Sequence, residues 1–308
     1  MLLGKVFKNL NRKYKSVKFN TICFNSKKCK PNDIFFAIKG NNSNGNKFIG
    51  NAINNGARVV VSDLKYEGLN KKKILFIKSK DPRKLLSEVA SNIYNKKPKN
   101  IIAVTGTNGK TSIVNFYYQI MSLNKKNVAS FGTLGVFSKK LKLKTNNTTI
   151  DPINIHKLLQ KLKENKVENV ILEASSHGLK QHRLNNINFN TALFTNLTRD
   201  HLDYHKTFKD YLNSKLILFN KLLKKNGNII FDTNTPQADL LNNISKKRNL
   251  RKYNFGDKKS LFKIKNIQTI NNNNQKKVDI LIYDKIYSFK TSLIGRIQIK
   301  NLVCAIIA

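Results

Sequence analysis

The stretch at residues 101–112, IIAVTGTNGKTS, constrains this chain more than any other part of it. Its apolar run has the composition of a buried strand, and it leads into a turn bracketed by Gly106 and Gly109. Beyond the turn, apolar residues recur at the spacing of an amphipathic helix that packs on a sheet. Glycines let the turn point backbone N–H groups at an anion, and the helix adds its positive N-terminal end. The stretch therefore predicts a phosphate-binding loop between a strand and a helix.

Two side chains at the start of that helix extend the prediction to a site for a nucleotide and a metal. Lys110 supplies a positive charge for phosphate, and the Thr111 hydroxyl can ligate Mg²⁺. The loop is two residues shorter than the general GxxxxGK[ST] pattern, so it is not an ordinary Walker loop. A glycine turn without a ligand would not account for lysine followed by threonine at a helix start.

The charge of the chain leaves two explanations open. The sequence has 58 Lys and Arg against 17 Asp and Glu, a formal net charge of +41. Clustered cations would favour nucleic-acid binding through counterion release, but these lysines are spread over nearly every segment. We favour the hypothesis that an AT-rich genome has shifted the surface composition, and a basic phosphate-loop protein that acts on nucleic acid is the alternative. A positive field would also attract a phosphorylated small substrate.

The sequence carries no signal for a membrane or a secretory route. No apolar run approaches the roughly 20 residues that span a bilayer, and the start of the chain lacks the apolar core of a signal peptide. We expect a cytoplasmic protein without a membrane partner, and a monomer. Cys23, Cys29 and Cys304 are odd in number and lack CxxC spacing, so we expect reduced thiols and neither a disulfide nor a zinc site.

The length of 308 residues and the pattern of elements predict an α/β protein of two domains. Residues 1–98 are expected to form a small α/β domain, with strands at 17–24, 33–38, 58–61 and 74–77 and helices at 47–55 and 81–94. The break at 96–99, rich in lysine with one proline, marks the boundary.

Residues 99–308 alternate strands and helices, which predicts a mostly parallel sheet with helices on both faces. Ligands bind beyond the carboxyl ends of the strands in such sheets. The loop at Gly106, Glu173 and residues 196–201 each follow a strand, so we expect them at one edge of the sheet. Further elements expected here are strands at 128–131, 169–172, 191–194, 228–231 and 252–255, a helix at 152–164, and a solvated turn through the asparagines at 271–274.

The helix expected within 207–223 carries a lysine on its apolar side. Lys215 lies on the same stripe as Phe208 and Phe219. A bare ammonium group that faces a core is costly, and spacing alone leaves two explanations. The side chain extends along the apolar surface to solvent. Alternatively, the amine lies in an active site with a partner, or is carbamylated by CO₂ and becomes an oxygen ligand for Mg²⁺.

Several motifs, in order along the chain, carry a resemblance to the Mur ligase family. TGTNGKT at 105–111 is similar to the family's ATP loop, and further matches are GTLG at 132–135, NTT at 147–149, EASSHGL at 173–179, QHR at 181–183 and FTNLTRDHLDYH at 194–205. The loop alone would also fit folylpolyglutamate synthases. The EASSHGL and RDHLDYH stretches are more specific, and the set resembles the UDP-N-acetylmuramoyl-tripeptide synthetases of peptidoglycan synthesis.

The resemblance implies a fold and a reaction. It implies a uridine-nucleotide-binding N-terminal domain, a P-loop-type central domain that binds ATP, and a third, Rossmann-like domain that this chain, ending at Ala308, would lack. The implied reaction joins meso-diaminopimelate to UDP-MurNAc-L-Ala-D-Glu in an ATP-dependent amide synthesis through an acyl phosphate. L-lysine is the alternative amino acid. A truncated fragment that binds substrate without turnover is the alternative function.

The resemblance also implies roles for single residues. Lys110, Glu173, His201 and carbamylated Lys215 are implied to be catalytic, and Thr111, Glu173, His201 and Lys215 to hold Mg²⁺. The implied ATP-binding residues are Thr105, Gly106, Thr107, Asn108, Gly109, Lys110, Thr111, Ser112 and Asn196. The implied substrate-binding residues are Phe24, Ser26, Asn41, Asn42, Ser43, Asn147, Thr148, Thr149, Ser175, Gln181 and Arg183. Where the family reads Asp-Ser-Arg, this chain has Asn25-Ser26-Lys27, which keeps the serine hydroxyl.

Overall fold

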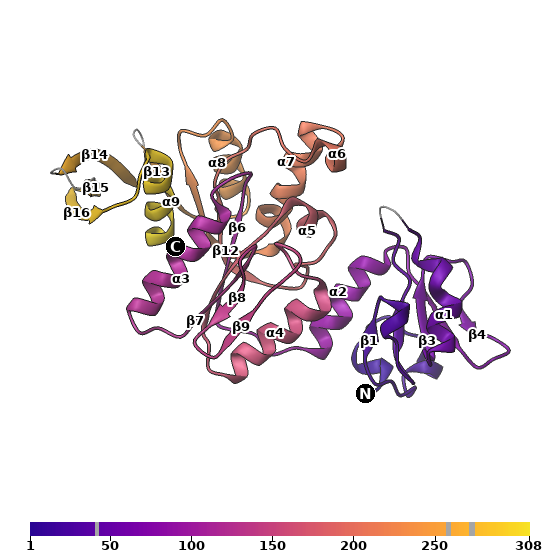
Figure 1. The fold of residues 1–308 in the computed structure, drawn as a ribbon. Helices are drawn as coiled ribbons and strands as arrows, with labels where there is room; N and C mark the ends of the chain where they lie inside the picture. The colour runs from indigo at the N-terminus through magenta and orange to yellow at the C-terminus, as the bar shows by residue number, and fades with distance from the viewer. Residues whose placement is uncertain (41–42, 257–259, 271–274) are drawn as a thin grey trace. The chain divides into compact units, whose positions relative to one another are not determined.

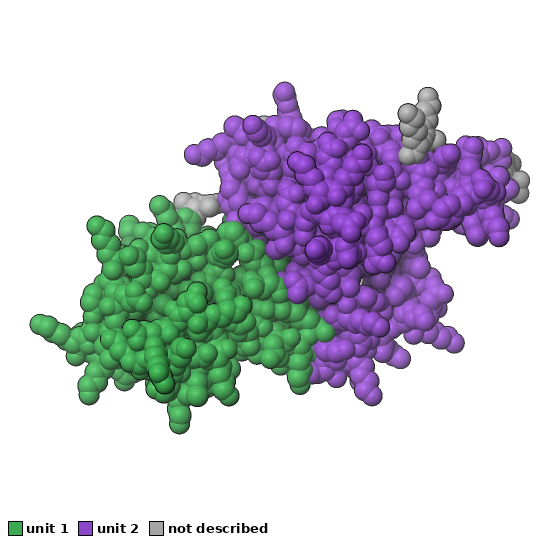
Figure 2. Space-filling model, turned by 180° about the vertical axis from the view of Figure 1, so that it is seen from behind, with its two compact units in different colours: residues 1–97, 151–161, 181–186 green, residues 98–150, 162–180, 187–308 purple. Residues whose placement is uncertain are grey.

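The computed structural model describes residues 1–40, 43–256, 260–270 and 275–308 and divides the chain into two compact units (Figure 2). Unit 1 comprises residues 1–97, 151–161 and 181–186, and unit 2 comprises 98–150, 162–180 and 187–308. The first division lies beside the expected boundary. Segments 151–161 and 181–186, which the sequence placed in the second domain, group with unit 1. Ile153 packs on the core of unit 1, and the Ser87 hydroxyl donates to the Asn185 carbonyl oxygen at 2.9 Å.

Unit 1 is built on a five-stranded sheet in the order β1-β2-β3-β5-β4, parallel except for β4 (Figure 1). A parallel sheet of this kind buries both faces, and every residue of β2 and β3 is buried. The strands are β1 Ile22–Cys23, β2 Ile34–Phe36, β3 Val59–Ser62, β4 Gly68–Leu69 and β5 Leu75–Lys78. The helices are α1 Ile49–Asn54 and α2 Pro82–Ile93, with short 3₁₀ turns η1 Leu3–Lys5, η2 Arg12–Tyr14, η3 Ser26–Lys28 and η4 Gly45–Phe48.

The two faces of this sheet form separate cores because side chains alternate along each strand. Phe36 and Val61 face a cluster that includes Val89 of α2, whereas Phe35 and Val60 face one that includes Ala52 of α1. The helices expected at 47–55 and 81–94 correspond to α1 and α2, whose ends differ from the expected ends by one or two residues. The strand expected at 17–24 is wrong in extent. Only Ile22–Cys23 pair as a strand.

A disulfide between Cys23 and Cys29 corrects the expectation of reduced thiols. Cys23 ends β1, and the chain returns through η3, so that the two Cα atoms lie 6.0 Å apart. This separation is within the range that a disulfide spans. Sequence spacing gave no such signal because the pairing depends on the fold of the intervening turn. Cys304 is a buried free thiol.

Unit 2 contains an eleven-stranded sheet in the order β16-β15-β14-β13-β12-β11-β6-β10-β7-β8-β9. In this order, the strands from β14 to β7 are parallel to one another, and the strands at both ends of the sheet are antiparallel. The prediction of a mostly parallel sheet is confirmed. The strands are β6 Asn100–Thr105, β7 Val128–Gly132, β8 Gly135–Ser138, β9 Leu141–Leu143, β10 Asn169–Glu173, β11 Phe189–Phe194, β12 Leu223–Asp232, β13 Arg251–Gly256, β14 Phe262–Ile270, β15 Gln275–Ile282 and β16 Lys285–Thr291.

The helices of unit 2 cover this sheet. They are α3 Lys110–Leu123, α5 Ser176–Lys180, α6 Leu202–His205, α7 Phe208–Ile217 with a π-helical turn at Leu218–Leu222, α8 Ala238–Lys247 and α9 Arg296–Ile307; α4 Pro152–Glu164 begins in unit 1 and ends in unit 2. α3 and α9 pack side by side, and Ile113 of α3 and Val303 of α9 share one core with Val104 of β6 (Figure 1). The asparagine turn expected at 271–274 lies outside the described residues.

Among the described residues, no helix is both long enough and apolar enough to cross a bilayer.

Candidate active site

Three loops meet at one edge of the central sheet of unit 2. β6 ends at Thr105, β10 at Glu173 and β11 at Phe194, and the three strands are parallel neighbours in the order β11-β6-β10. The carboxyl ends of neighbouring parallel strands lie at the same edge, where α/β sheets bind ligands. The convergence that the sequence predicted for these loops is confirmed.

The loop after β6 is held open by the segment that follows β11. The Asn108 backbone N–H donates to Asn196 Oδ1 at 3.0 Å, and the Thr195 hydroxyl donates to the Asn108 carbonyl oxygen at 2.6 Å. Gly106 has φ +147°, and a Cβ there would lie 1.8 Å from Thr195 Oγ1. A side chain at Gly106 would therefore break the contact that shapes the loop, which explains the glycine physically.

The Lys110 amine folds back over the loop. Its Nζ donates to the carbonyl oxygens of Gly106 at 3.0 Å and Thr107 at 2.7 Å. Burial lowers the pKa of Lys110, while the charges of Glu173 and Asp200 oppose that shift. The amine thus lies over the loop, and phosphate oxygens could replace the two carbonyl oxygens as its hydrogen-bond acceptors.

Glu173 is the carboxylate of this edge. It is 2% exposed, and both carboxylate oxygens accept from the Thr111 hydroxyl at 3.0 Å. The Thr133 backbone N–H donates to Glu173 Oε1 at 2.8 Å. The carboxylate lies so close to β7 that a Cβ on Gly132 would sit 2.1 Å from Oε1. Hydroxyl and carboxylate oxygens are donors that a hard cation prefers, so Thr111 and Glu173 fit Mg²⁺ chemically.

Lys215 lies buried beneath the loop. It is 1% exposed, its Nζ donates to the Gly106 carbonyl oxygen at 2.8 Å, and the amine lies 4.2 Å from the centre of the Tyr211 ring. The alternative in which this side chain extends to solvent is therefore wrong. Burial, and secondarily the charge of Lys110, lower the pKa of Lys215 to about 7. Near neutral pH a substantial fraction of this amine is uncharged and nucleophilic.

A group of aromatic rings lies beyond the loop on α5, α6 and α7. The centre of the His201 ring is 5.0 Å from that of His177 and 6.1 Å from that of Tyr211. His201 is exposed, whereas His205 is fully buried with its Nδ1 3.3 Å from the Ser214 hydroxyl. Burial lowers the pKa of His205. Of this pair, His201 is the one whose ring a ligand could reach from solvent.

No three His, Cys, Asp or Glu side chains gather as a metal-binding group in the part of the chain that the structure describes. The expected metal set of Thr111, Glu173, His201 and Lys215 has two such residues. Its remaining oxygens would come from the threonine hydroxyl and from a carbamate on the lysine.

The acceptor-binding residues expected in unit 2 surround Glu173. The Thr149 hydroxyl donates to the Glu173 carbonyl oxygen at 2.9 Å and accepts from the Ser175 N–H at 3.0 Å. Thr148 Oγ1 lies 3.0 Å from Thr133 Oγ1. Asn147 is exposed in the same segment. Thr149 and Ser175 are thus linked by hydrogen bonds to the end of β10, and Thr148 is linked to Thr133, whose N–H donates to Glu173.

The other expected acceptor residues belong to unit 1. Gln181 and Arg183 follow α5, and the Arg183 guanidinium donates to Gln181 Oε1 at 2.7 and 3.1 Å. Phe24 is 43% exposed, Ser26 is buried, and Ser43 is exposed. Asn41 and Asn42 lie outside the described residues.

Unit 1 also contains a cavity of about 530 Å³ beside this segment. Its wall combines apolar, amide, cationic and anionic side chains: Ile22, Phe24, Asn25, Lys28, Lys30, Asp33, Asp151 and Ile153 are among the lining residues. An aromatic ring with amides and lysines around it suits a base that carries phosphates.

Three further residues support the site, although no role was predicted for them. Thr133 donates to Glu173 from its backbone, Thr195 fixes Asn108, and the Tyr211 hydroxyl lies 3.2 Å from Thr107 Oγ1. Thr133 and Thr195 stand inside the quoted motifs, so their positions gave a signal. Tyr211 lies outside the quoted motifs, so no signal of this kind pointed to it.

Substituting Gly132 with alanine should disrupt this edge without touching the loop. The new Cβ would lie 2.1 Å from Glu173 Oε1, so the carboxylate must move away from Thr111. We expect nucleotide affinity measured by calorimetry with Mg²⁺ to fall about tenfold, a loss of ~1.4 kcal/mol. Gly50→Ala is the matched control, because a Cβ at Gly50 meets nothing within 4 Å. Equal losses in the two variants would contradict the assigned role of Glu173.

The fold and the site are those of an α/β protein with a short glycine-bracketed loop, a buried carboxylate and a buried amine at one edge of a mostly parallel sheet. Residues 104–308 match the model of the Mur ligase middle domain, and residues 18–94 match that of the Mur ligase family catalytic domain. The chain therefore belongs to the Mur ligase family.

Relatives of known name agree with this membership. The chain is 38% identical over 308 residues to the UDP-N-acetylmuramoyl-L-alanyl-D-glutamate–2,6-diaminopimelate ligase of Rickettsia montanensis, covering 97% of this chain and 62% of that protein. It is 43% identical over 216 residues to the Clostridium tetani ligase of the same name, covering 69% of this chain and 44% of that protein. The chain thus spans about three fifths of the first relative's length.

Solved structures show the same fold. A structure of a ligase of that name superposes with a TM-score of 0.82 at 25% identity, covering 97% of this chain and 61% of that one. MurF ligase from Thermotoga maritima in complex with ADP superposes with a TM-score of 0.62 at 19% identity, covering 93% and 61%. The second likeness concerns the fold alone.

Proposed function

We propose that this chain supplies the UDP-substrate site and the ATP site of a ligase that adds meso-diaminopimelate to UDP-MurNAc-L-Ala-D-Glu. The observation that carries the proposal is the edge at which the phosphate loop, Glu173 and Lys215 meet. Relatives at 36–43% identity bear the name of this ligase, which favours diaminopimelate over L-lysine as the added amino acid.

The proposed reaction has two steps. A γ-carboxylate oxygen of D-glutamate attacks the γ-phosphorus of ATP, and ADP leaves. The amine nitrogen of diaminopimelate then attacks the acyl carbon, phosphate leaves, and the nitrogen loses a proton. Both steps need negative charge to be neutralised and the reactants to be held in place more than they need a nucleophile from the protein.

The residues of the loop would bind the nucleotide. The backbone N–H groups of residues 106–111 and the Lys110 amine would hold the β- and γ-phosphates, and the amine would exchange its bonds to Gly106 and Thr107 for bonds to phosphate. Asn196 and Thr195 would keep the loop open. Thr111 and Glu173 would hold Mg²⁺, which when bound supplies positive charge at the phosphates.

Lys215 would add an anionic oxygen ligand at the same edge. Its neutral amine would attack the carbon of CO₂: an N–C bond forms, one C=O π bond opens and its electron pair moves to oxygen, and the nitrogen loses a proton to water, which gives a carbamate. With Glu173 and His201, the carbamate would hold or orient a second Mg²⁺ near the acyl phosphate. A pKa of about 7 makes the required neutral amine accessible.

Each unit by itself contains expected acceptor contacts. Phe24, Ser26 and Ser43, with the cavity beside β1, would take the uridine nucleotide. In unit 2, Thr148 and Ser175 would contact the peptide. In unit 1, the planar fork of the Arg183 guanidinium suits a carboxylate. The remaining expected contacts are those of Asn147, Thr149 and Gln181.

Calorimetric titration with two precursors tests this function. We expect UDP-MurNAc-L-Ala-D-Glu to bind at least about tenfold tighter than UDP-MurNAc-L-Ala, because the second lacks the reacting carboxylate and a difference of ~1.4 kcal/mol fits one charged contact. Equal affinity for the two precursors would contradict the proposal. If neither precursor binds and the protein is retained on DNA at physiological salt, the nucleic-acid alternative is favoured instead.

A further inference from the structure

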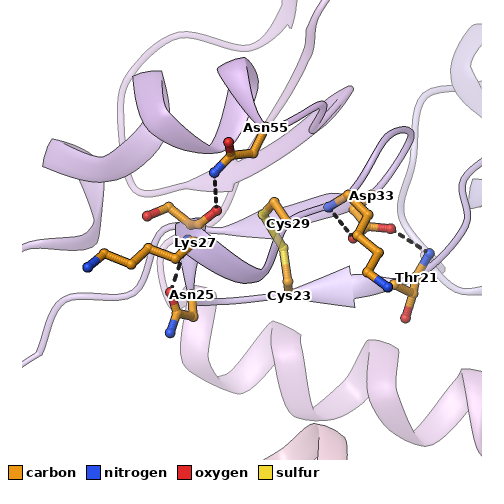
Figure 3. The surroundings of a disulfide bond; sticks show 9 residues. Thr21, Cys23, Asn25, Lys27, Cys29, Asp33 and Asn55 are labelled. Carbon is orange, nitrogen blue, oxygen red and sulfur yellow. Dashed lines mark hydrogen bonds between the residues drawn. A yellow bond between two sulfur atoms is a disulfide. The ribbon is translucent and has the colours of Figure 1, made fainter.

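The Cys23–Cys29 disulfide encloses the segment to which the proposed function assigns the uridine nucleotide. Figure 3 shows the disulfide with Asn25 and Lys27 of the segment between the two cysteines. Residues 24–28 also include Phe24, Ser26 and Lys28. Cys23 itself lines the cavity of about 530 Å³ with Phe24 and Asn25. A change at this disulfide therefore acts on the wall of that cavity.

The base of the enclosed segment is held independently of the disulfide. One oxygen of Asp33 accepts from the Thr21 N–H at 3.1 Å and the other accepts from the Lys30 N–H at 2.9 Å (Figure 3). Asp33 is 1% exposed, so these bonds are protected from water. Opening the disulfide would leave both ends of the segment attached to the sheet, and unit 1 would stay folded.

The tip of the segment has fewer attachments. Asn25 caps η3 by accepting from the Lys27 N–H at 3.0 Å, which is a bond within the segment. The bond from Asn55 Nδ2 to the Ser26 carbonyl oxygen, 2.9 Å, joins the segment to α1 (Figure 3). Without the disulfide, this bond and the packing of the cysteines on the core behind β2 would restrain residues 24–28.

A small thiol can reach the disulfide through the cavity. Cys23 lines it, and the charged residues of the wall are Lys28, Lys30, Asp33 and Asp151, so the wall carries both signs of charge. The cysteines are 8% and 7% exposed, which limits attack from other directions. A ligand that fills the cavity would block this route.

We propose that the Cys23–Cys29 pair is a redox switch for nucleotide-substrate affinity: the disulfide form preorganises residues 24–28 for the uridine nucleotide, and the dithiol form binds it more weakly. The inference rests on the proposed function of unit 1. Ligand binding and disulfide state are linked, so the bound precursor stabilises the disulfide to the same extent that the disulfide favours the precursor.

The switch uses thiol–disulfide exchange with a cellular dithiol as reductant. A thiolate of the dithiol attacks one cysteine sulfur, the protein S–S bond breaks, and the other cysteine leaves as a thiolate that takes up a proton. The second thiol of the reductant, as thiolate, then attacks the mixed disulfide and releases the remaining cysteine. The protein gains two electrons and two protons, and the dithiol becomes a cyclic disulfide.

The test compares the purified wild-type protein in its oxidised form and after reduction with dithiothreitol. Calorimetry should show UDP-MurNAc-L-Ala-D-Glu binding about tenfold weaker to the reduced form, the equivalent of ~1.4 kcal/mol, because preorganisation is lost. MgATP affinity, which depends on the loop of unit 2, should be the same in both forms. In a dithiothreitol redox buffer, the saturating precursor should shift the disulfide–dithiol equilibrium toward the disulfide by about the same factor. Mass spectrometry after thiol alkylation measures the two forms.

Two variants separate the pair from general thiol effects. The double variant Cys23→Ser with Cys29→Ser should have the affinity of the reduced form and no response to dithiothreitol. Cys304→Ala, which alters the remaining thiol in α9, should respond as the wild type does. Should the double variant fail to fold, the two wild-type forms still decide the question.

The outcomes are distinguishable. Equal precursor affinity in the two wild-type forms would overturn the switch and leave the proposed function standing. Precursor binding in neither form would overturn the proposed function and the switch together. Failure of Cys23 and Cys29 to link under an excess of oxidised glutathione would overturn the switch alone.

Discussion

Replacing Lys215 with alanine is expected to abolish CO₂ incorporation into the protein and, with it, ligase activity. Lys215 is the lysine whose amine is buried against the Gly106 carbonyl oxygen, with a pKa lowered to about 7. The carbamate carbon should give a carbonyl signal in a ¹³C NMR spectrum recorded with ¹³C-bicarbonate. We expect this signal in the wild type and its complete loss in Lys215→Ala.

Controls for this experiment come from the same helix. Lys209 is exposed on α7, so Lys209→Ala should keep the signal. Lys215→Glu should not restore activity well, because its carboxylate ends several bonds short of the position of a carbamate. A signal that survives in Lys215→Ala, or undiminished ligase activity of that variant, would return Lys215 to the role of a buried structural amine.

The same residue should make stability depend on pH in a defined direction. The folded-state pKa of about 7 lies below the ordinary value of 10.5, so between these values the unfolded chain binds more protons than the folded one. The cost of burying the amine is fully present below about pH 7 and fades as pH rises towards 10.5. Urea unfolding in CO₂-free buffer should show this rise, and Lys215→Met should flatten it. An identical slope in the two proteins would contradict the burial of a titrating amine.

Replacing Lys110 with alanine is expected to weaken ATP binding about a hundredfold, the equivalent of ~3 kcal/mol, because a charged hydrogen-bond donor to phosphate is lost. The Lys110 amine donates to the carbonyl oxygens of Gly106 and Thr107 within its own loop, so the fold should persist without it. Calorimetry with MgATP measures the loss, and circular dichroism checks the fold.

Lys126→Ala serves as the matched control for Lys110→Ala, since Lys126 is an exposed lysine just beyond the C-terminal end of α3. Its ATP affinity should equal that of the wild type. Equal ATP affinity in Lys110→Ala and the wild type would remove the phosphate-loop assignment.

The central part of the site could be predicted because its chemistry is local. A strand, a glycine-bracketed turn and a helix that starts with Lys110 and Thr111 are continuous in the sequence, and parallel topology then brings Glu173 and Asn196 to the same edge. The contacts of Thr111 with Glu173 and of Asn108 with Asn196 confirm that placement. The roles of these residues in catalysis stay predictions.

Other features depend on long-range packing and could not be predicted. Residues 151–161 and 181–186 join unit 1 through contacts such as that of Ser87 with Asn185, which sequence periodicity does not encode. The Cys23–Cys29 disulfide depends on how η3 returns the chain to β1. Helical spacing placed Lys215 on an apolar stripe but did not show whether its amine is buried or extends to solvent. The hydrogen bond to the Gly106 carbonyl oxygen shows that it is buried.

A crystal structure with Mg²⁺, a non-hydrolysable ATP analogue and bicarbonate is the most direct test of the central claim, that this sheet edge is the ATP site of the ligase. We predict the β- and γ-phosphates within the loop at 105–111, Mg²⁺ on Thr111 and Glu173, and density for a carbamate on Lys215. A nucleotide bound elsewhere, or Mg²⁺ bound away from Glu173 beside an unmodified Lys215 amine, would contradict the account.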